Sequence, residues 1–197
     1  MDGFKVRTDK KRELIIQSAL VLFKSFSPSK VSIREIAGQA QVSVVTIYNY
    51  FGSKEGLIVE VVRTVLSEQL HAADQITQSD DSTEEKLAAL IFTKNELLSQ
   101  FHPDFISFIM NDPQMKELIE TEFINKTYEM ITTFINDAKT EGTISPDVPN
   151  DLIMKIIELY RKDISSGQSI LFSDQESRKN HEIILRTLMY GISGYKK

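Results

Sequence analysis

The segment VSVVTIYNYFGSK, residues 42–54, carries side chains suited to contact with another molecule. An asparagine amide can pair with base edges, apolar groups can pack on thymine methyl groups, and hydroxyls can bind phosphate oxygens. An ordinary surface helix would carry Lys, Glu and Ala instead. The side chains with this potential are Val44, Val45, Thr46, Tyr48, Asn49 and Tyr50.

Local signals place this segment in the second of two short helices. Ser32 and Glu35 have the spacing of a capping box, which predicts a helix of about two turns up to residue 40. Ser43 can cap the next helix, to about Tyr50, and Ser53 a longer one. With an amphipathic helix expected over about residues 9–26, this order predicts a helix-turn-helix motif in a small helical domain.

One side of the second short helix is expected to be buried. Ile47 and Phe51 are four residues apart and can pack against the preceding helix, which leaves the six side chains above largely uncovered. For Tyr48 alone, a half-buried position in the core is an equal alternative. One short helix cannot bury every side, so the set as a whole predicts a DNA-reading surface.

The charge distribution fits this prediction better than the net charge of −5 does. Through residue 55 the chain has nine basic and five acidic side chains, and the rest has 14 basic and 23 acidic ones. The first quarter is therefore a candidate polyanion contact attached to an acidic body. The basic stretch 5–12 is either a DNA-contacting arm or a solvated tail.

The remainder of the chain reads as helical, so we expect an all-α fold. Ser82 with Glu85, and Asp112 with Pro113, mark further helix starts, and a long helix is expected from Pro113 to near Gly142. Two C-terminal helices are expected over about 150–166 and 174–194. No β alternation or internal repeat competes with this interpretation.

Other classes of protein find little support in the sequence. There is no cysteine, which excludes disulfides and thiolate chemistry, and no apolar run long enough to span a bilayer. The three histidines are widely separated, and neither an HExxH nor a P-loop spacing occurs. We therefore expect a cytoplasmic protein without metal, cofactor or enzymatic activity; a helical enzyme is a remote alternative.

Residues of roughly 9–58 resemble the DNA-binding domain of TetR-family transcriptional regulators. The resemblance lies in VSIREIAGQAQVS followed by VTIYNYFGSKEGL, and it covers about a quarter of the chain. It implies DNA-binding roles for Ser32, Arg34, Val44, Val45, Thr46, Tyr48, Asn49, Tyr50 and Lys54. Two positions depart from the family pattern: Gln41 replaces the usual glycine of the turn, and Val45 replaces glycine, lysine or proline. A left-handed backbone at Gln41 would cost about 1–2 kcal/mol.

The resemblance also implies a DNA-binding domain in residues 1–55 and a domain for effector binding and dimerisation in residues 56–197. Dense aromatic residues suggest an effector pocket, although such a stripe usually forms core. The predicted pocket residues are Phe92, Asn95, His102, Phe105, Phe108, Phe123 and Tyr128. The predicted dimer residues, whose faces could instead close the chain's own core, are Ile153, Ile156, Ile157, Tyr160, Ile184, Leu188 and Ile192.

The expected function is that of a homodimeric repressor that binds a palindromic double-stranded operator and is released by an unknown small-molecule effector. The alternative is a TetR-like DNA-binding protein controlled by a protein partner, or one that acts in chromosome organisation, with no small ligand.

Overall fold

The computed structural model describes residues 3–87, 89–90, 100–165, 187 and 191–192. Every regular element within these ranges is helical, which confirms the all-α prediction. No helix among them has the length and apolar character needed to cross a membrane. The helices are α1 (Gly3–Ser25), α2 (Ile33–Gln39), α3 (Val44–Phe51), α4 (Lys54–Thr77), α6 (Pro103–Asn111), α7 (Pro113–Ile119), the π-helix η1 (Glu120–Ile124), α8 (Asn125–Thr140) and α9 (Asn150–Ser165).

The chain divides into two compact units. The first comprises residues 1–70 and 97–124, and the second comprises residues 71–96 and 125–197. Each unit has its own hydrophobic core in the described residues. This packing groups α6 and α7 with the helix-turn-helix segment. The division into functional domains at residue 55 stays a prediction.

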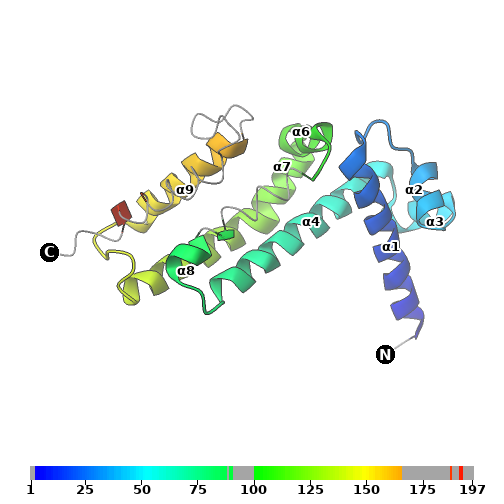
Figure 1. Cartoon of the computed structure of the whole chain (residues 1–197). Coiled ribbons are helices and arrows are strands. Elements are labelled where there is room, and N and C mark those ends of the chain that lie inside the picture. The colour runs from blue at the N-terminus through cyan, green and yellow to red at the C-terminus, as the bar shows by residue number, and fades with distance from the viewer. Residues whose placement is uncertain (1–2, 88, 91–99, 166–186, 188–190, 193–197) are drawn as a thin grey trace. The chain divides into compact units, whose positions relative to one another are not determined.

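The first unit packs its helices on a core that includes α6. Figure 1 shows α1, α2 and α3 gathered around the first turns of α4. Phe105 of α6 stacks on Phe23 of α1 with ring centroids 5.2 Å apart, and on Phe101 at 5.0 Å. Complete burial of such a phenylalanine contributes roughly 1.5–3 kcal/mol. Residues distant in sequence from the helix-turn-helix segment therefore help to hold it together.

The second unit is built on α8 and α9. Phe134 and Ile135 of α8 share a core with Ile153 of α9. The ammonium group of Lys139 donates to the carbonyl oxygen of Val148 and to the side-chain oxygen of Asn150, the first residue of α9, both at 2.6 Å. These contacts fix the connection between the two helices.

Several predicted helix starts are confirmed by their hydrogen bonds. The Glu85 amide donates to the Ser82 hydroxyl at 3.3 Å, and the Met115 amide donates to the Asp112 carboxylate at 3.0 Å. The long helix predicted from Pro113 differs from expectation because η1 interrupts it. The predicted helix at 174–194 lies outside the described residues apart from 187 and 191–192, which are helical.

Candidate nucleic-acid interface

The two short helices begin where the sequence predicts. In α2 the Glu35 amide donates to the Ser32 hydroxyl at 3.2 Å, and the Ser32 amide donates back to the Glu35 carboxylate at 2.7 Å, which completes the capping box. In α3 the Thr46 amide donates to the Ser43 hydroxyl at 3.1 Å. Both helices therefore have a hydrogen-bonded first turn although each is at most eight residues long.

The turn between α2 and α3 is a Schellman motif. The Val42 amide donates to the Ala37 carbonyl at 3.0 Å, and the Gln41 amide donates to the Gly38 carbonyl at 3.3 Å. Gln41 has a φ of 54°, so the left-handed conformation considered from the sequence is present. The turn thus retains the geometry that glycine would favour, at the energetic cost of a side chain.

The exposed side of α3 carries an apolar, an aromatic and an amide group. Val45 is 66% exposed and Tyr48 is 48% exposed, and Asn49 is also exposed. Ile47, on the opposite side, is fully buried. Within the described part of the chain, Tyr48 and Asn49 have no side-chain hydrogen bond, so their polar groups can meet an external partner.

The other three candidate residues of α3 are half-buried. Val44 and Tyr50 pack against the core of the first unit, and the Thr46 hydroxyl lies 2.8 Å from that of Ser43. The expectation of a largely uncovered surface is therefore confirmed for Val45, Tyr48 and Asn49, and it is too broad for these three. The core reaches further around α3 than its own sequence pattern indicates.

The flanking polar residues differ in their freedom to contact DNA. Arg34 is exposed on α2 and has no ion-pair partner among the described residues. The Ser32 hydroxyl is engaged in the capping box. Lys54 is half-buried and donates from its ammonium group to the Pro28 carbonyl at 2.5 Å. Lys54 therefore fixes the loop before α2, and a phosphate contact would use its remaining donors.

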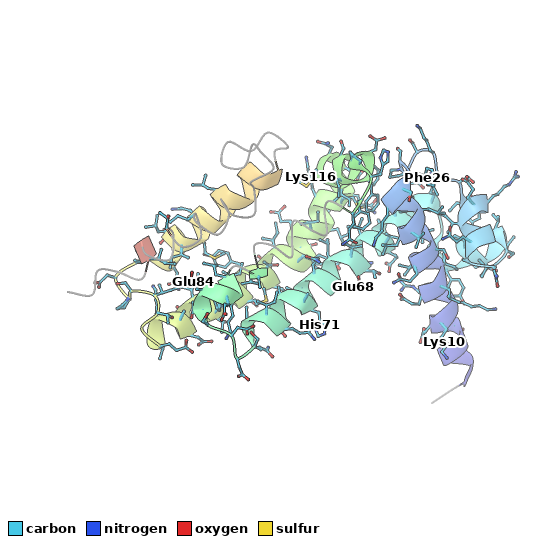
Figure 2. All side chains as sticks on the ribbon, viewed as in Figure 1. Lys10, Phe26, Glu68, His71, Glu84 and Lys116 are labelled. Atoms are coloured by element: carbon cyan, nitrogen blue, oxygen red, sulfur yellow. The ribbon has the colours of Figure 1, made fainter. Side chains whose placement is uncertain are left out.

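The basic N-terminal stretch is part of α1, which starts at Gly3 and not near Asp9 as expected. Lys10 is exposed and projects from this part of the helix (Figure 2). Arg12 forms an ion pair with Glu60 of α4. The whole stretch 5–12 is thus helical, and its last basic residue, Arg12, is engaged within the protein.

Two carboxylates at the helix starts have lowered pKa values. Hydrogen bonds from the Ser32 amide and hydroxyl, helped by the charge of Lys54, lower the pKa of Glu35. The pKa of Glu55 is lowered by its own backbone N–H, then by the Ser53 hydroxyl and by Lys54. Both groups therefore stay ionised at neutral pH and complement the dipoles of α2 and α4.

A close backbone approach between α3 and α4 was missed by the sequence interpretation. A Cβ atom at Gly56 would lie 2.1 Å from the carbonyl oxygen of Phe51, the last residue of α3. Only glycine allows this approach without a shift of the backbone. The sequence around Gly56 does not indicate this close approach, because the constraint depends on the angle between two helices.

The predicted pocket residues of the first unit lie close to its core. Phe105 and Phe123 are buried in that core, and Phe108 packs against it half-buried. His102 caps α6, accepting at Nδ1 from the Asp104 amide at 3.2 Å. These residues contribute to the core of the first unit and to the cap of α6, and the pocket stays a prediction.

The remaining predicted pocket and dimer residues belong to the second unit or lie outside the described residues. Tyr128 is exposed on α8, Ile153 and Ile192 are buried in the unit's own core, and Ile156 is half-buried. Ile157 and Tyr160 lie in α9, but their side chains are outside the described set. The predicted residues that lie outside the described residues altogether are Phe92, Asn95, Ile184 and Leu188.

No group of three or more His, Asp or Glu residues in the described ranges could hold a metal ion. The exposed side of α3 can provide hydrogen bonding and apolar contact, and Arg34 of α2 and Lys54 of α4 add positive charge. These are the properties of a helix-turn-helix DNA-binding protein.

Comparison with known proteins gives the family. Residues 15–61 match the family described as bacterial regulatory proteins, tetR family. The HTH-type transcriptional repressor KstR2 of Mycolicibacterium smegmatis is 24% identical over 151 residues, which cover 75% of this chain and 74% of the repressor. Residues 15–61 thus match the TetR family of transcriptional regulators, and a transcriptional repressor resembles the chain over most of its length.

Two solved structures share the fold over nearly the whole chain. One is a TetR-family regulator from Mesorhizobium loti, with a TM-score of 0.71 and 20% identity, covering 93% of this chain and 96% of that one. The other is the regulator FadR of Bacillus subtilis in complex with stearoyl-CoA, with a TM-score of 0.62 and 15% identity, covering 90% and 95%. The fold likeness extends to the helices beyond the helix-turn-helix segment.

Proposed function

We propose that this DNA-binding regulator is a repressor that binds a palindromic operator as a homodimer and leaves it when a small molecule binds. The observation that carries the proposal is the exposed side of α3, with Val45, Tyr48 and Asn49. Residues 1–55 would contain the DNA-binding function, and residues 56–197 the effector-binding and dimerisation functions. The site of action would be the cytoplasm, where the operator is.

A homodimer is supported by an apolar stripe on α9. Leu152 is 46% exposed and Leu159 is 66% exposed, and they are seven residues apart on the same side of the helix, with Ile156 between them. Ile153 faces the unit's own core. A second copy that covers this stripe would remove the leucines from water and would place two α3 helices on one DNA.

The effector proposal rests on the family and on the chemistry of the chain. The FadR structure contains stearoyl-CoA, a ligand with a long apolar tail. The part of this chain beyond residue 55 has 14 basic and 23 acidic side chains, which disfavours a highly anionic ligand. We therefore propose an effector that is mainly apolar and carries little negative charge.

The test compares dimerisation and DNA binding in the same variants. Leu159→Glu is expected to give a monomer in sedimentation and to weaken binding to a palindromic site, whereas Met110→Ala, at an exposed apolar residue of α6, should change neither. Tyr48→Ala should leave the dimer intact and weaken binding by about tenfold or more, the value of one or two lost base contacts. Full-affinity binding by Leu159→Glu and by Tyr48→Ala would refute the proposal.

Effector release is tested on the same complex with labelled DNA. Neutral apolar compounds are titrated into the protein–DNA complex alongside stearoyl-CoA, and fluorescence anisotropy reports dissociation. Release by a neutral apolar compound at a concentration that leaves Tm unchanged or raised supports the proposed effector class. Release by stearoyl-CoA alone would contradict the preference for low charge.

A further inference from the structure

A chain of charged contacts joins three segments of the first unit that are far apart in sequence. The carboxylate of Glu60 on α4 pairs with Arg12 of α1 and with Arg63 of α4. Arg63 in turn binds Glu122 of η1 through two parallel hydrogen bonds, from Nε at 2.9 Å and from its second terminal nitrogen at 2.8 Å. We call Arg12, Glu60, Arg63 and Glu122 the Glu60 network.

Glu60 has a special place in this network because its two oxygens serve different partners. Oε2 faces Arg12 and Oε1 faces Arg63. A movement of Arg63 therefore turns the same carboxylate that holds Arg12. The Arg63–Glu122 contact is bidentate, which fixes the guanidinium plane as well as its distance. Exposed single ion pairs contribute little, but bidentate pairs in a network are the exception.

One end of the Glu60 network reaches α3, which the proposed function makes the recognition helix. The guanidinium carbon of Arg12 lies 5.6 Å from the ring centroid of Phe51, the last residue of α3. The carbonyl oxygen of Phe51 is also the atom nearest to the place that a Cβ on Gly56 of α4 would occupy. The position of Arg12 is thus linked to the end of α3 by a cation–π contact, and the start of α4 lies directly against that end.

The other end of the network lies in the π-helix. Glu122 is the central residue of η1, which has one more residue per hydrogen-bonded turn than an α-helix. Conversion of η1 to α geometry would change the rotation of Glu122 around the helix axis and so disturb its contact with Arg63. Single π turns inside longer helices occur often at functional sites.

We infer that Arg63 and Glu122 are positioning residues for DNA binding, because they transmit the geometry of η1 through Glu60 and Arg12 to the end of α3. None of the four residues needs to touch DNA for this role. The inference rests on the proposed function for its biological meaning, but its physical content, a coupling between η1 and α3, holds for the free protein.

The first experiment measures amide hydrogen exchange in the free protein. Glu122→Gln removes the charge that holds Arg63, and Glu120→Gln makes the same change at an exposed residue of the same π-helix, outside the network. We expect Glu122→Gln to accelerate exchange by about threefold or more at the end of α3 and around residue 12, the size of a weak ion-pair effect. Glu120→Gln should accelerate neither region.

Two further variants distinguish coupling from a general loss of stability. Arg63→Lys keeps the positive charge but loses the bidentate contact of the guanidinium group. It should therefore accelerate exchange in the same regions less than Glu122→Gln does. The exchanged pair Arg63→Glu with Glu122→Arg restores the contact with η1 but places a carboxylate beside Glu60, so it should restore protection in η1 and not at the end of α3. Accelerated exchange confined to η1 and the adjacent part of α4 would overturn the inference, whatever the Tm of the variants.

The second experiment uses DNA selected by the wild-type protein from a random-sequence pool. Glu122→Gln should weaken binding to that DNA several-fold at a temperature far below Tm, with the salt dependence unchanged, because no phosphate contact is lost. If Glu122→Gln binds the selected DNA with unchanged affinity although its amide hydrogen exchange at the end of α3 is accelerated, the positioning role in DNA binding is refuted. If no DNA is selected, the proposed function fails, and the exchange experiment still decides whether the coupling exists.

Discussion

Gln41 occupies the same left-handed position after α2 that Gly142 occupies after α8. Their φ angles are 54° and 75°. In both turns the following amide donates to the carbonyl five residues earlier, Val42 to Ala37 at 3.0 Å and Thr143 to Ala138 at 2.9 Å. One chain therefore contains the same helix ending with and without glycine.

This pair predicts opposite effects on stability. Gln41→Gly should raise the free energy of unfolding by about 0.5–1 kcal/mol, because relief of roughly 1–2 kcal/mol of backbone strain exceeds the entropy gained by the unfolded chain. Gly142→Gln should lower it by a similar or larger amount. Urea denaturation measures both. A Gln41→Gly variant that is no more stable than wild type would show that the turn is not strained.

Gly56 is expected to be intolerant of a methyl group. Gly56→Ala would force a shift between α3 and α4, because its Cβ would lie 2.1 Å from the Phe51 carbonyl oxygen. We expect a loss of about 1–3 kcal/mol in the free energy of unfolding. Gly38→Ala is the control, since a Cβ there meets nothing within 4 Å, and it should stabilise α2 by up to about 1 kcal/mol. Equal stability of the two variants would contradict the close approach.

Substitution of Arg34 and of Lys54 by alanine should have different effects on protein stability. Arg34→Ala is expected to leave Tm unchanged and to lower the salt slope of DNA binding by about one, the signature of one lost phosphate contact. Lys54→Ala also removes the hydrogen bond to Pro28, so it should lower stability by about 1–2 kcal/mol as well as affinity. Salt titrations and denaturation curves separate the two effects. An unaltered salt slope in Arg34→Ala would remove its proposed role.

Acid stability should depend on the capping box of α2. The pKa of Glu35 is lowered in the folded chain from 4.5, so the unfolded chain binds more protons between the two values. The stabilisation is present above the unfolded pKa and is lost as pH falls through the folded one. Glu35→Gln cannot ionise, so its Tm should fall less than that of the wild type between about pH 6 and pH 3. Identical acid profiles would exclude this contribution.

The parts of the fold and of the interface that the sequence predicted are those fixed by neighbouring residues. Ser32 with Glu35, Ser43 and Asp112 with Pro113 all act within one helical turn, so their roles can be recognised without the fold. The exposure of Val45, Tyr48 and Asn49 follows from the same short-range geometry once Ile47 is known to face inwards.

The features that escaped prediction depend on contacts between distant segments. The stacking of Phe105 on Phe23 joins α6 to α1, and Glu122 reaches Arg63 from 59 residues away in sequence. The sequence pattern around these residues does not indicate that they contact such distant partners. Val44 and Tyr50 are half-buried for the same reason, because the core that covers them extends beyond the two short helices.

The central claim is most directly tested by selecting bound fragments from random double-stranded DNA with the purified protein. The account predicts enrichment of one palindrome whose half-sites are centred about 34 Å, one helical turn, apart. It also predicts that Tyr48→Ala fails to enrich that palindrome while retaining salt-sensitive non-specific binding. Recovery of fragments without a common sequence by the wild-type protein, or of the same palindrome by Tyr48→Ala, would contradict the assignment of α3 as the recognition helix.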